Sequence, residues 1–220
     1  MEWIDLGVPR PKEQPELYQP VKWDSEEVIS LAMTKPNLTA SVGAVMNRRR
    51  SSRRLESMPL SSLADLLATV SQVRDRLDTP YGFSIERRPT PSAGAIHPIH
   101  IVVEGPGIPW SHYEAKSHAL SRLSNGHLLE PLGSACAEII DAPNAWTLLF
   151  IAEPGRTAAK YAFAQSLVWR DAGVLQGTLA IAAEALDIGF CLLGLTGEPW
   201  ASMLSENRLI GVGVALAGAR

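Results

Sequence analysis

The strongest constraint on the fold is a stretch from Thr157 to Leu186 in which apolar side chains recur at spacings of three and four. The stripe consists of Tyr161, Ala164, Val168, Ala172, Leu175, Leu179, Ala182 and Leu186. Small residues, among them Gly173 and Gly177, stand on its other sides. A helix that is apolar or small around much of its surface is buried on several sides. We therefore predict one long central helix, which packs closely within the subunit or against another subunit.

Apolar segments with other periods predict the sheet. We expect strands at Pro98–Glu104, Trp146–Ala152 and Arg208–Ala217, and a β-hairpin at Leu120–Leu132. Trp146–Ala152 is a continuous apolar run, which is typical of a strand buried on both faces, and Asn125-Gly126 is a strong hairpin-turn signal. Helices come first, then strands, a long helix and a last strand. This order predicts an α+β fold with a mixed, mainly antiparallel sheet flanked by helices.

The N-terminal part is expected to differ from the rest. Residues 1–22 contain four prolines, which disfavour helices and central strands, so an extended arm is predicted there. Asp24 and Ser25 can cap a short helix to about Met33, and Ser41 can cap a second one. A third helix is expected at Pro59–Val73, with Ser62 as its N-cap. We predict an arm with a short helix at residues 1–40 and one domain at residues 41–220.

Composition excludes several classes of function. The net charge of −3 argues against a general nucleic-acid binder. Two cysteines make no disulfide framework, no signal peptide is visible at the N-terminus, and the apolar stretch from Thr178 to Leu195 is interrupted by Glu184 and Asp187. We expect a cytoplasmic protein without a membrane span. The five histidines and two cysteines show no zinc-like spacing, so no metal is predicted.

Basic residues gather in Asn47–Arg54, which holds five arginines and two serines. Guanidinium groups match phosphate oxygens bidentately, and serine hydroxyls add short donors. The segment could therefore hold a phosphate monoester. It could equally be a solvated basic patch or an RNA contact.

A loop of small residues, Pro91–Pro98, precedes the first clear strand. Its Gly94 permits backbone dihedrals that other residues avoid, and its small side chains let the backbone approach a planar ligand. An ordinary turn at the start of a strand is the alternative interpretation.

The order of these motifs resembles one family. Arg-Arg-Ser-x-Arg-x-Leu at 49–55, Pro-Ser-Ala-Gly-Ala-x-x-Pro at 91–98 and Lys160-Tyr161 follow one another, and Arg170-Asp171-Ala172-Gly173 and Leu186-Asp187-Ile188-Gly189 come later. The pattern is similar to that of the SagB-type dehydrogenases, the azoline oxidases of thiazole and oxazole peptide biosynthesis, within the FMN-dependent nitroreductase superfamily. The resemblance covers roughly residues 41–217.

The resemblance implies a cofactor and its contacts. FMN would be bound at the interface of a homodimer. Arg49, Arg50, Ser51 and Arg53 would contact its phosphate and ribityl chain, and Ser92, Ala93, Gly94 and Gly189 would lie against the flavin. Two features depart from the superfamily. No C-terminal Lys-x-Arg is present, so that either Arg208 or Arg220 replaces it or the N-terminal arginines suffice. Ala95 stands where many nitroreductases have an asparagine.

The resemblance assigns Lys160 and Tyr161 to proton abstraction while the flavin accepts hydride. Adjacent helical residues point about 100° apart, so both can serve one site only near a helix end or across an interface. A surface lysine beside a core tyrosine is the alternative interpretation. We expect dehydrogenation of a peptide-like or natural-product intermediate, in company with biosynthetic partner enzymes. A nitro or quinone reductase that uses NAD(P)H and a non-catalytic partner subunit are the other two possibilities.

Overall fold

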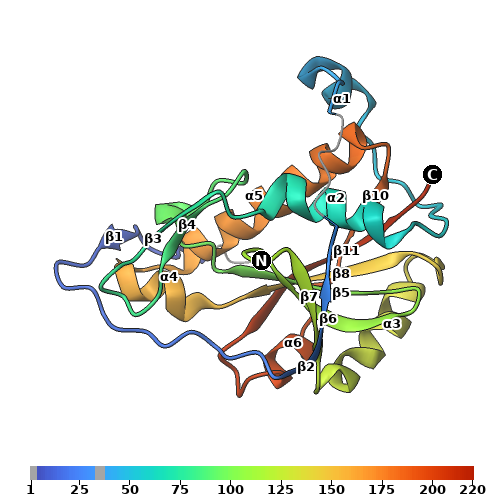
Figure 1. Ribbon diagram of the computed structural model, residues 1–220. Helices are drawn as coiled ribbons and strands as arrows, with labels where there is room; N and C mark the ends of the chain where they lie inside the picture. The colour runs from blue at the N-terminus through green and yellow to red at the C-terminus, as the bar shows by residue number, and fades with distance from the viewer. Residues whose placement is uncertain (1–3, 33–37) are drawn as a thin grey trace.

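A seven-stranded sheet forms the centre of the computed structural model, which describes residues 4–32 and 38–220 (Figure 1). Every neighbouring pair in it is antiparallel. The strand order is β10 (Gly189–Leu193), β11 (Ile210–Gly218), β8 (Trp146–Ala152), β5 (Ile99–Gly105), β6 (Ile108–Glu114), β7 (Ala119–Leu123) and β2 (Ser25–Ser30). Two small sheets pair β1 (Arg10–Pro11) with β9 (Tyr161–Ala162) and β3 (Asp75–Leu77) with β4 (Ile85–Arg87).

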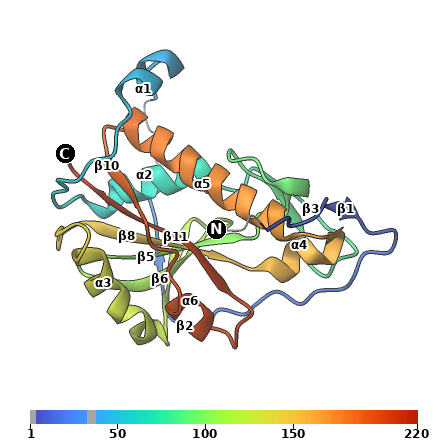
Figure 2. The ribbon, with the colours of Figure 1, turned by 180° about the vertical axis from the view of Figure 1, so that it is seen from behind.

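Helices cover both faces of the sheet (Figures 1 and 2). The helices are α1 (Val42–Arg48), α2 (Leu60–Ser71), α3 (Glu130–Ala137), α4 (Pro154–Lys160), α5 (Gln165–Ala185) and α6 (Trp200–Met203), with short 3₁₀ turns at Ala93–Ala95 and Gly126–Leu129. Helices α2 and α5 pack on one face, and α3 and α6 pack on the other. No helix within the described ranges is long and apolar enough to cross a lipid bilayer.

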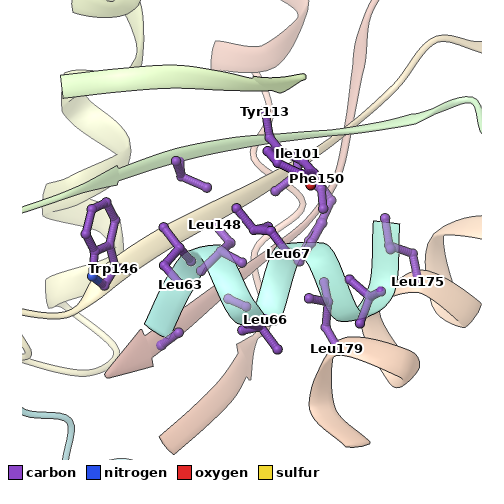
Figure 3. Close-up of a cluster of buried hydrophobic side chains, with 14 of the residues drawn as sticks. Leu63, Leu66, Leu67, Ile101, Tyr113, Trp146, Leu148, Phe150, Leu175 and Leu179 are labelled. Carbon is purple, nitrogen blue, oxygen red and sulfur yellow. The ribbon is translucent and has the colours of Figure 1, made fainter. Parts of the chain in front are cut away.

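The core consists of two layers because side chains of a strand alternate between faces. Ile101 and Phe150 face α2 and α5, whereas Val102 and Leu149 face α3 and α6. Figure 3 shows the first layer, in which Leu63, Leu66 and Leu67 of α2 lie against Leu148 and Phe150 of β8 and against Leu175 and Leu179 of α5. The three α2 leucines are fully buried. Burial of each leucine side chain contributes about 1.5–3 kcal/mol to stability.

The predicted fold class is confirmed, and so are several elements. Strand β8 has the predicted bounds, and all seven of its residues are buried. The strands expected at Pro98–Glu104 and Arg208–Ala217 correspond to β5 and β11. Ser41 caps α1, since its hydroxyl oxygen accepts the Ala44 N–H at 3.2 Å.

The predicted hairpin at Leu120–Leu132 is wrong. Only β7 forms there, and Asn125 has a φ of −100°, which does not fit the turn that Asn-Gly favours. The chain enters the 3₁₀ turn and then α3, because Leu129 and Leu132 bury completely at helical spacing against the second face of the sheet. The hairpin that ends at β7 begins instead at β6.

Two helix predictions near the N-terminus also need correction. Ser25–Ser30 form strand β2, which pairs with β7, in place of the helix from Asp24; its expected end, Met33, lies outside the described residues. Helix α2 begins at Leu60 with Pro59 as its N-cap, so Ser62 stands inside the first turn.

The long helix predicted at Thr157–Leu186 is interrupted. Helix α4 ends at Lys160, Tyr161 and Ala162 are extended, and Phe163 has a left-handed φ of 54°. The extended pair forms strand β9 with Arg10–Pro11 of the N-terminal arm. Pairing with a distant segment therefore overrides the local helical period, and the central helix α5 begins only at Gln165.

Candidate functional site

The predicted phosphate-binding segment leaves the end of α1 and runs along β10. The Ser52 N–H donates to the Phe190 carbonyl at 3.0 Å, and a β-carbon on Gly189 would lie 2.6 Å from the Leu55 side chain. Gly189 thus allows close packing of the segment against the sheet edge. Both features place the arginines next to β10 and the C-terminal end of α5.

A buried carboxylate fixes two cations in this region. Glu184, near the end of α5, has 2% of its side chain exposed and accepts from Arg48 Nε at 3.2 Å and from Arg220. The hydrogen bond from Arg220 is the main reason that the pKa of Glu184 lies below its ordinary value. Of the two expected replacements for the missing C-terminal motif, Arg220 therefore stands beside the arginine segment. Arg208 donates instead to Tyr18 and to the Gln19 carbonyl.

The other arginines are not neutralised. Arg49, Arg50 and Arg53 are exposed, and no carboxylate within residues 4–32 and 38–220 pairs with them. Ser51 is exposed beside them. A surface cavity of about 450 Å³ is lined by Asn47, Arg48, Arg49, Arg50, Glu184 and Arg220. Free guanidinium donors around a cavity fit the phosphate group of a ligand.

The loop of small residues is held by Asp171 of α5. Ser92 Oγ donates to Asp171 Oδ2 at 2.6 Å, and the Ala93 N–H donates to Oδ1 at 3.1 Å. Burial, partly offset by these bonds, raises the pKa of Asp171 above its ordinary value. Asp171 was not among the predicted site residues, although a charged residue between apolar positions of the predicted helix was a signal for it. Asp171 positions the loop, while the Ser92 hydroxyl and Ala93 amide are engaged inside the protein.

The backbone of this loop is strained. Gly94, Ala95 and His97 have φ values of 65°, 56° and 49°, a left-handed conformation that alanine and histidine rarely adopt. Such conformations persist where surrounding contacts impose them, and they cluster at functional sites. The His97 ring lies 2.9 Å from the Glu86 carbonyl, and burial lowers its pKa to about 4. His97 is therefore neutral at pH 7 and anchors the loop to β4.

Lys160 and Tyr161 converge on Gly94. A β-carbon at Gly94 would lie 2.9 Å from both Lys160 Nζ and Tyr161 Oη, so a larger residue would push these two groups aside, and the φ of 65° favours glycine as well. Lys160 is the last residue of α4 and Tyr161 begins β9, so the pair stands at a helix end, where the sequence allowed both side chains to reach one site. The two predicted catalytic residues and the predicted flavin loop thus form one cluster.

The predicted site residues form two groups at opposite ends of α5 (Figures 1 and 2). One group, near Glu184, is Arg49, Arg50, Ser51, Arg53 and Gly189; the other, near Asp171, is Ser92, Ala93, Gly94, Lys160 and Tyr161. Asp171 and Glu184 are thirteen positions apart in α5, a rise of about 20 Å. A ligand that contacts both groups within one subunit would have to extend along α5.

One face of α5 is uncovered between the two groups. Trp169 and Ile181 expose 48% and 40% of their surface, and Val174 exposes 39%. Between them Gly173 and Gly177 stand in open space, since nothing lies within 4 Å of the position of a β-carbon. Positions 169, 173, 177 and 181 form an i+4 ridge, the kind that packs against another helix.

Replacing Asp171 with alanine should destabilise the protein by about 1–3 kcal/mol, because two partly buried donors, Ser92 Oγ and the Ala93 amide, lose their acceptor. Urea unfolding measures the loss, and amide hydrogen exchange at residues 92–97 should quicken. The matched control is Asp141→Ala, at an exposed position in the loop before β8, which should change neither. Equal unfolding midpoints for the two variants would remove Asp171 from the support of the loop.

Comparisons with known proteins identify the fold. No family model and no curated protein matches this sequence. Among solved structures, a protein from Ralstonia eutropha that is assigned as a nitroreductase matches with a TM-score of 0.65 at 16% identity, over 96% of this chain and 98% of that one. The chain has a nitroreductase-like fold.

Two further structures with this fold bear on the site. The Escherichia coli microcin synthetase McbBCD complex with truncated pro-MccB17 bound matches with a TM-score of 0.56 at 14% identity, over 86% of this chain and 77% of that one. A protein from Desulfovibrio desulfuricans, assigned as a nitroreductase and crystallised with FMN, gives 0.53 at 17% identity, over 81% and 86%. Within the described residues, no group of three or more His, Cys, Asp or Glu side chains is placed to hold a metal.

Proposed function

We propose that the protein is an FMN-dependent oxidoreductase. The unpaired Arg49 and Arg50 line the cavity and, with the exposed Ser51 and Arg53 that follow them, provide donors suited to the FMN phosphate. Arg220 supplies a further cation at the same cavity. The likeness of the fold to that of an FMN-bound protein supports the same cofactor. Bound FMN would supply a two-electron acceptor that takes up hydride.

The active form in this proposal is a homodimer with FMN at its interface. Two copies related by a two-fold axis through the middle of α5 would pack their uncovered α5 faces antiparallel. The arginine end of one subunit then lies near the Gly94 loop of its partner. This arrangement unites the two groups of site residues that α5 separates within a subunit, and it covers Trp169, Val174 and Ile181.

The reaction we propose is dehydrogenation of an azoline or a similar peptide-like intermediate to its aromatic product. The convergence of Lys160 Nζ and Tyr161 Oη on Gly94 is the observation that carries this proposal. The Lys160 amine would accept one hydrogen of the substrate as a proton, while hydride from the neighbouring C–H bond would pass to the two-electron acceptor that bound FMN supplies. The Tyr161 hydroxyl orients that amine or the substrate. Partner enzymes of the same biosynthesis would supply the substrate; the match to a synthetase complex, McbBCD, supports such partners.

Replacing Lys160 with alanine should retain FMN and reduce turnover by about 100-fold or more, the contribution typical of a general base. The assay follows conversion of 2-phenylthiazoline to 2-phenylthiazole by absorbance, with oxygen as the final acceptor. The control is Lys22→Ala, an exposed lysine shortly before β2, which should match the wild type. Full activity of the Lys160 variant would exclude the amine as base.

Reduction by nicotinamides separates the proposed dehydrogenase from a reductase. Stopped-flow mixing of the FMN-loaded protein with NADPH should bleach the flavin slowly, and single-turnover mixing with 2-phenylthiazoline should bleach it faster. The opposite order of rates would assign the protein to the NAD(P)H-dependent reductases. Binding of FMN with no reduction by either compound would favour a non-catalytic partner subunit.

A further inference from the structure

A second cavity, of about 250 Å³, lies beside the cluster of Gly94, Lys160 and Tyr161. Its walls come from the arm, from α4, and from β4, β5 and β6. Arg156 of α4 lines it and stands one helical turn before Lys160, on the same side of the helix. The Arg156 guanidinium lies 4.6 Å from the centre of the Phe83 ring, and Lys160 Nζ lies 6.0 Å from the centre of Tyr81. Since these two rings are 5.9 Å apart, the cavity and the catalytic cluster are neighbours.

Arg156 is buried without enough partners. Its side chain is 13% exposed, it donates to the Ile96 carbonyl at 3.4 Å, and it stands 3.8 Å from Glu153 Oε2. Its Nε is buried and has no hydrogen-bond partner among the described residues. Burial lowers the pKa of Arg156 below its ordinary value, which reflects the cost of the desolvated cation. A guanidinium has five N–H donors, so most of these donors are unused.

The charged side chains around the cavity leave a net charge of one positive unit, which suits a ligand with one negative charge. Arg76, Arg88, Lys116 and Arg156 line it, opposed by Glu86 and Glu114. Glu86 is occupied by Arg88, whose Nε donates to it at 3.0 Å. Glu153 lies behind Arg156 and is itself satisfied by Tyr18, Val21 and His100 at 2.9, 2.5 and 2.9 Å. Counting Glu153, four cations face three carboxylates, so a monoanion balances the site and a phosphate dianion exceeds it.

We propose that this cavity binds the carboxylate of the substrate through Arg156, and thereby places the substrate against Lys160. A planar carboxylate matches the guanidinium fork, and Phe83 and Tyr113 give the cavity an aromatic wall for the adjoining group. The catalytic consequence rests on the proposed function, whereas carboxylate binding itself does not need FMN. The substrate class is then an azoline acid, either a free small molecule or the C-terminal residue of a peptide.

The binding test uses calorimetric titration of the FMN-free protein at low ionic strength. Hippurate, which mimics a peptide C-terminus, and benzoate, which is a simple acid, should bind, whereas benzamide and inorganic phosphate should not. Tighter binding of hippurate would indicate a peptide C-terminus as the source of the carboxylate, and tighter binding of benzoate would indicate a free small molecule. Absence of binding by both acids, or phosphate binding as tight as theirs, would overturn the proposal.

Variants locate the binding. Arg156→Lys should lower the affinity for the more tightly bound acid about tenfold, because the bidentate geometry is lost, and Arg156→Gln should abolish binding of that acid. Lys116→Glu, at an exposed position of the cavity wall, should lower the affinity for the same acid about fivefold at low salt without risk to the fold. Arg122→Gln, on β7, is the control and should bind as the wild type does. Unchanged affinity in folded Arg156→Gln would contradict the assignment.

The catalytic consequence has a separate readout. The KM for 2-phenylthiazoline-4-carboxylate should rise in Arg156→Lys, while the KM for 2-phenylthiazoline should stay the same. If FMN fails to bind but the acids still do, the proposed function falls and the carboxylate site stands. If the enzyme is active and the acids do not bind, the reverse holds.

Discussion

The double variant Arg49→Ala, Arg53→Ala should no longer retain FMN. The two guanidinium groups are exposed and unpaired, so their loss removes phosphate contacts without leaving a buried carboxylate unpaired. Each charge-assisted hydrogen bond is worth about 1.5–3 kcal/mol, which predicts affinity for FMN at least about 100-fold weaker. Flavin absorbance of the purified variant and titration with FMN measure the loss.

The matched control for this experiment removes the same charge elsewhere. Arg74 and Arg122 are exposed and lie away from the arginine segment, so Arg74→Ala, Arg122→Ala should keep full FMN occupancy. Riboflavin, which lacks the phosphate, should bind the wild type and the Arg49, Arg53 variant equally weakly. Unchanged FMN affinity in that variant would mean that the segment is a solvated basic patch.

The variant Val174→Arg should be monomeric and should also lose FMN, although every arginine remains. Val174 is exposed near the midpoint of α5, so the substitution leaves the fold of one subunit intact. In the proposed two-fold packing, the midpoint of the helix meets its own copy, and two like charges would face each other. A buried unpaired charge costs about 3–5 kcal/mol, so the dissociation constant of the dimer should rise about 100-fold or more. Sedimentation velocity and FMN titration on the same sample test both effects.

The control for dimer formation is Ile139→Arg after α3, at a position that is 50% exposed and on the other side of the sheet. It should sediment and bind FMN as the wild type does. A Val174→Arg protein that stays dimeric would exclude the α5 face as the interface. A monomer with undiminished FMN affinity would instead show that one subunit holds the whole site.

The sequence predicted correctly those helices and strands whose conformation depends mainly on residues close together in the chain. Trp146–Ala152 was predictable because a short run of only apolar and β-branched residues fits a strand covered on both faces. Asn125-Gly126 misled because its turn preference is weaker than the burial of Leu129 and Leu132 in the second core layer. Tyr161 was wrongly predicted to be helical because no residue near it in the sequence indicates that it pairs with Pro11.

In the candidate site too, residues in short motifs were predictable, whereas contacts between residues far apart in the chain were not. Short motifs predicted Gly94, Lys160 and Tyr161 as site residues, and the fold brings these three together. The support of the loop by Asp171 links it to Ser92, 79 positions earlier in the chain, and such a contact is not visible in one sequence. The separation of the two site groups by α5 was equally unpredictable, because it depends on how the helix lies across the sheet.

Titration of FMN with the purified wild-type chain tests the central proposal most directly. Quenching of flavin fluorescence should saturate at one FMN per subunit, and the bound flavin should sediment with the dimer. Fluorescence that stays unchanged at protein concentrations well above that of the flavin would contradict the account.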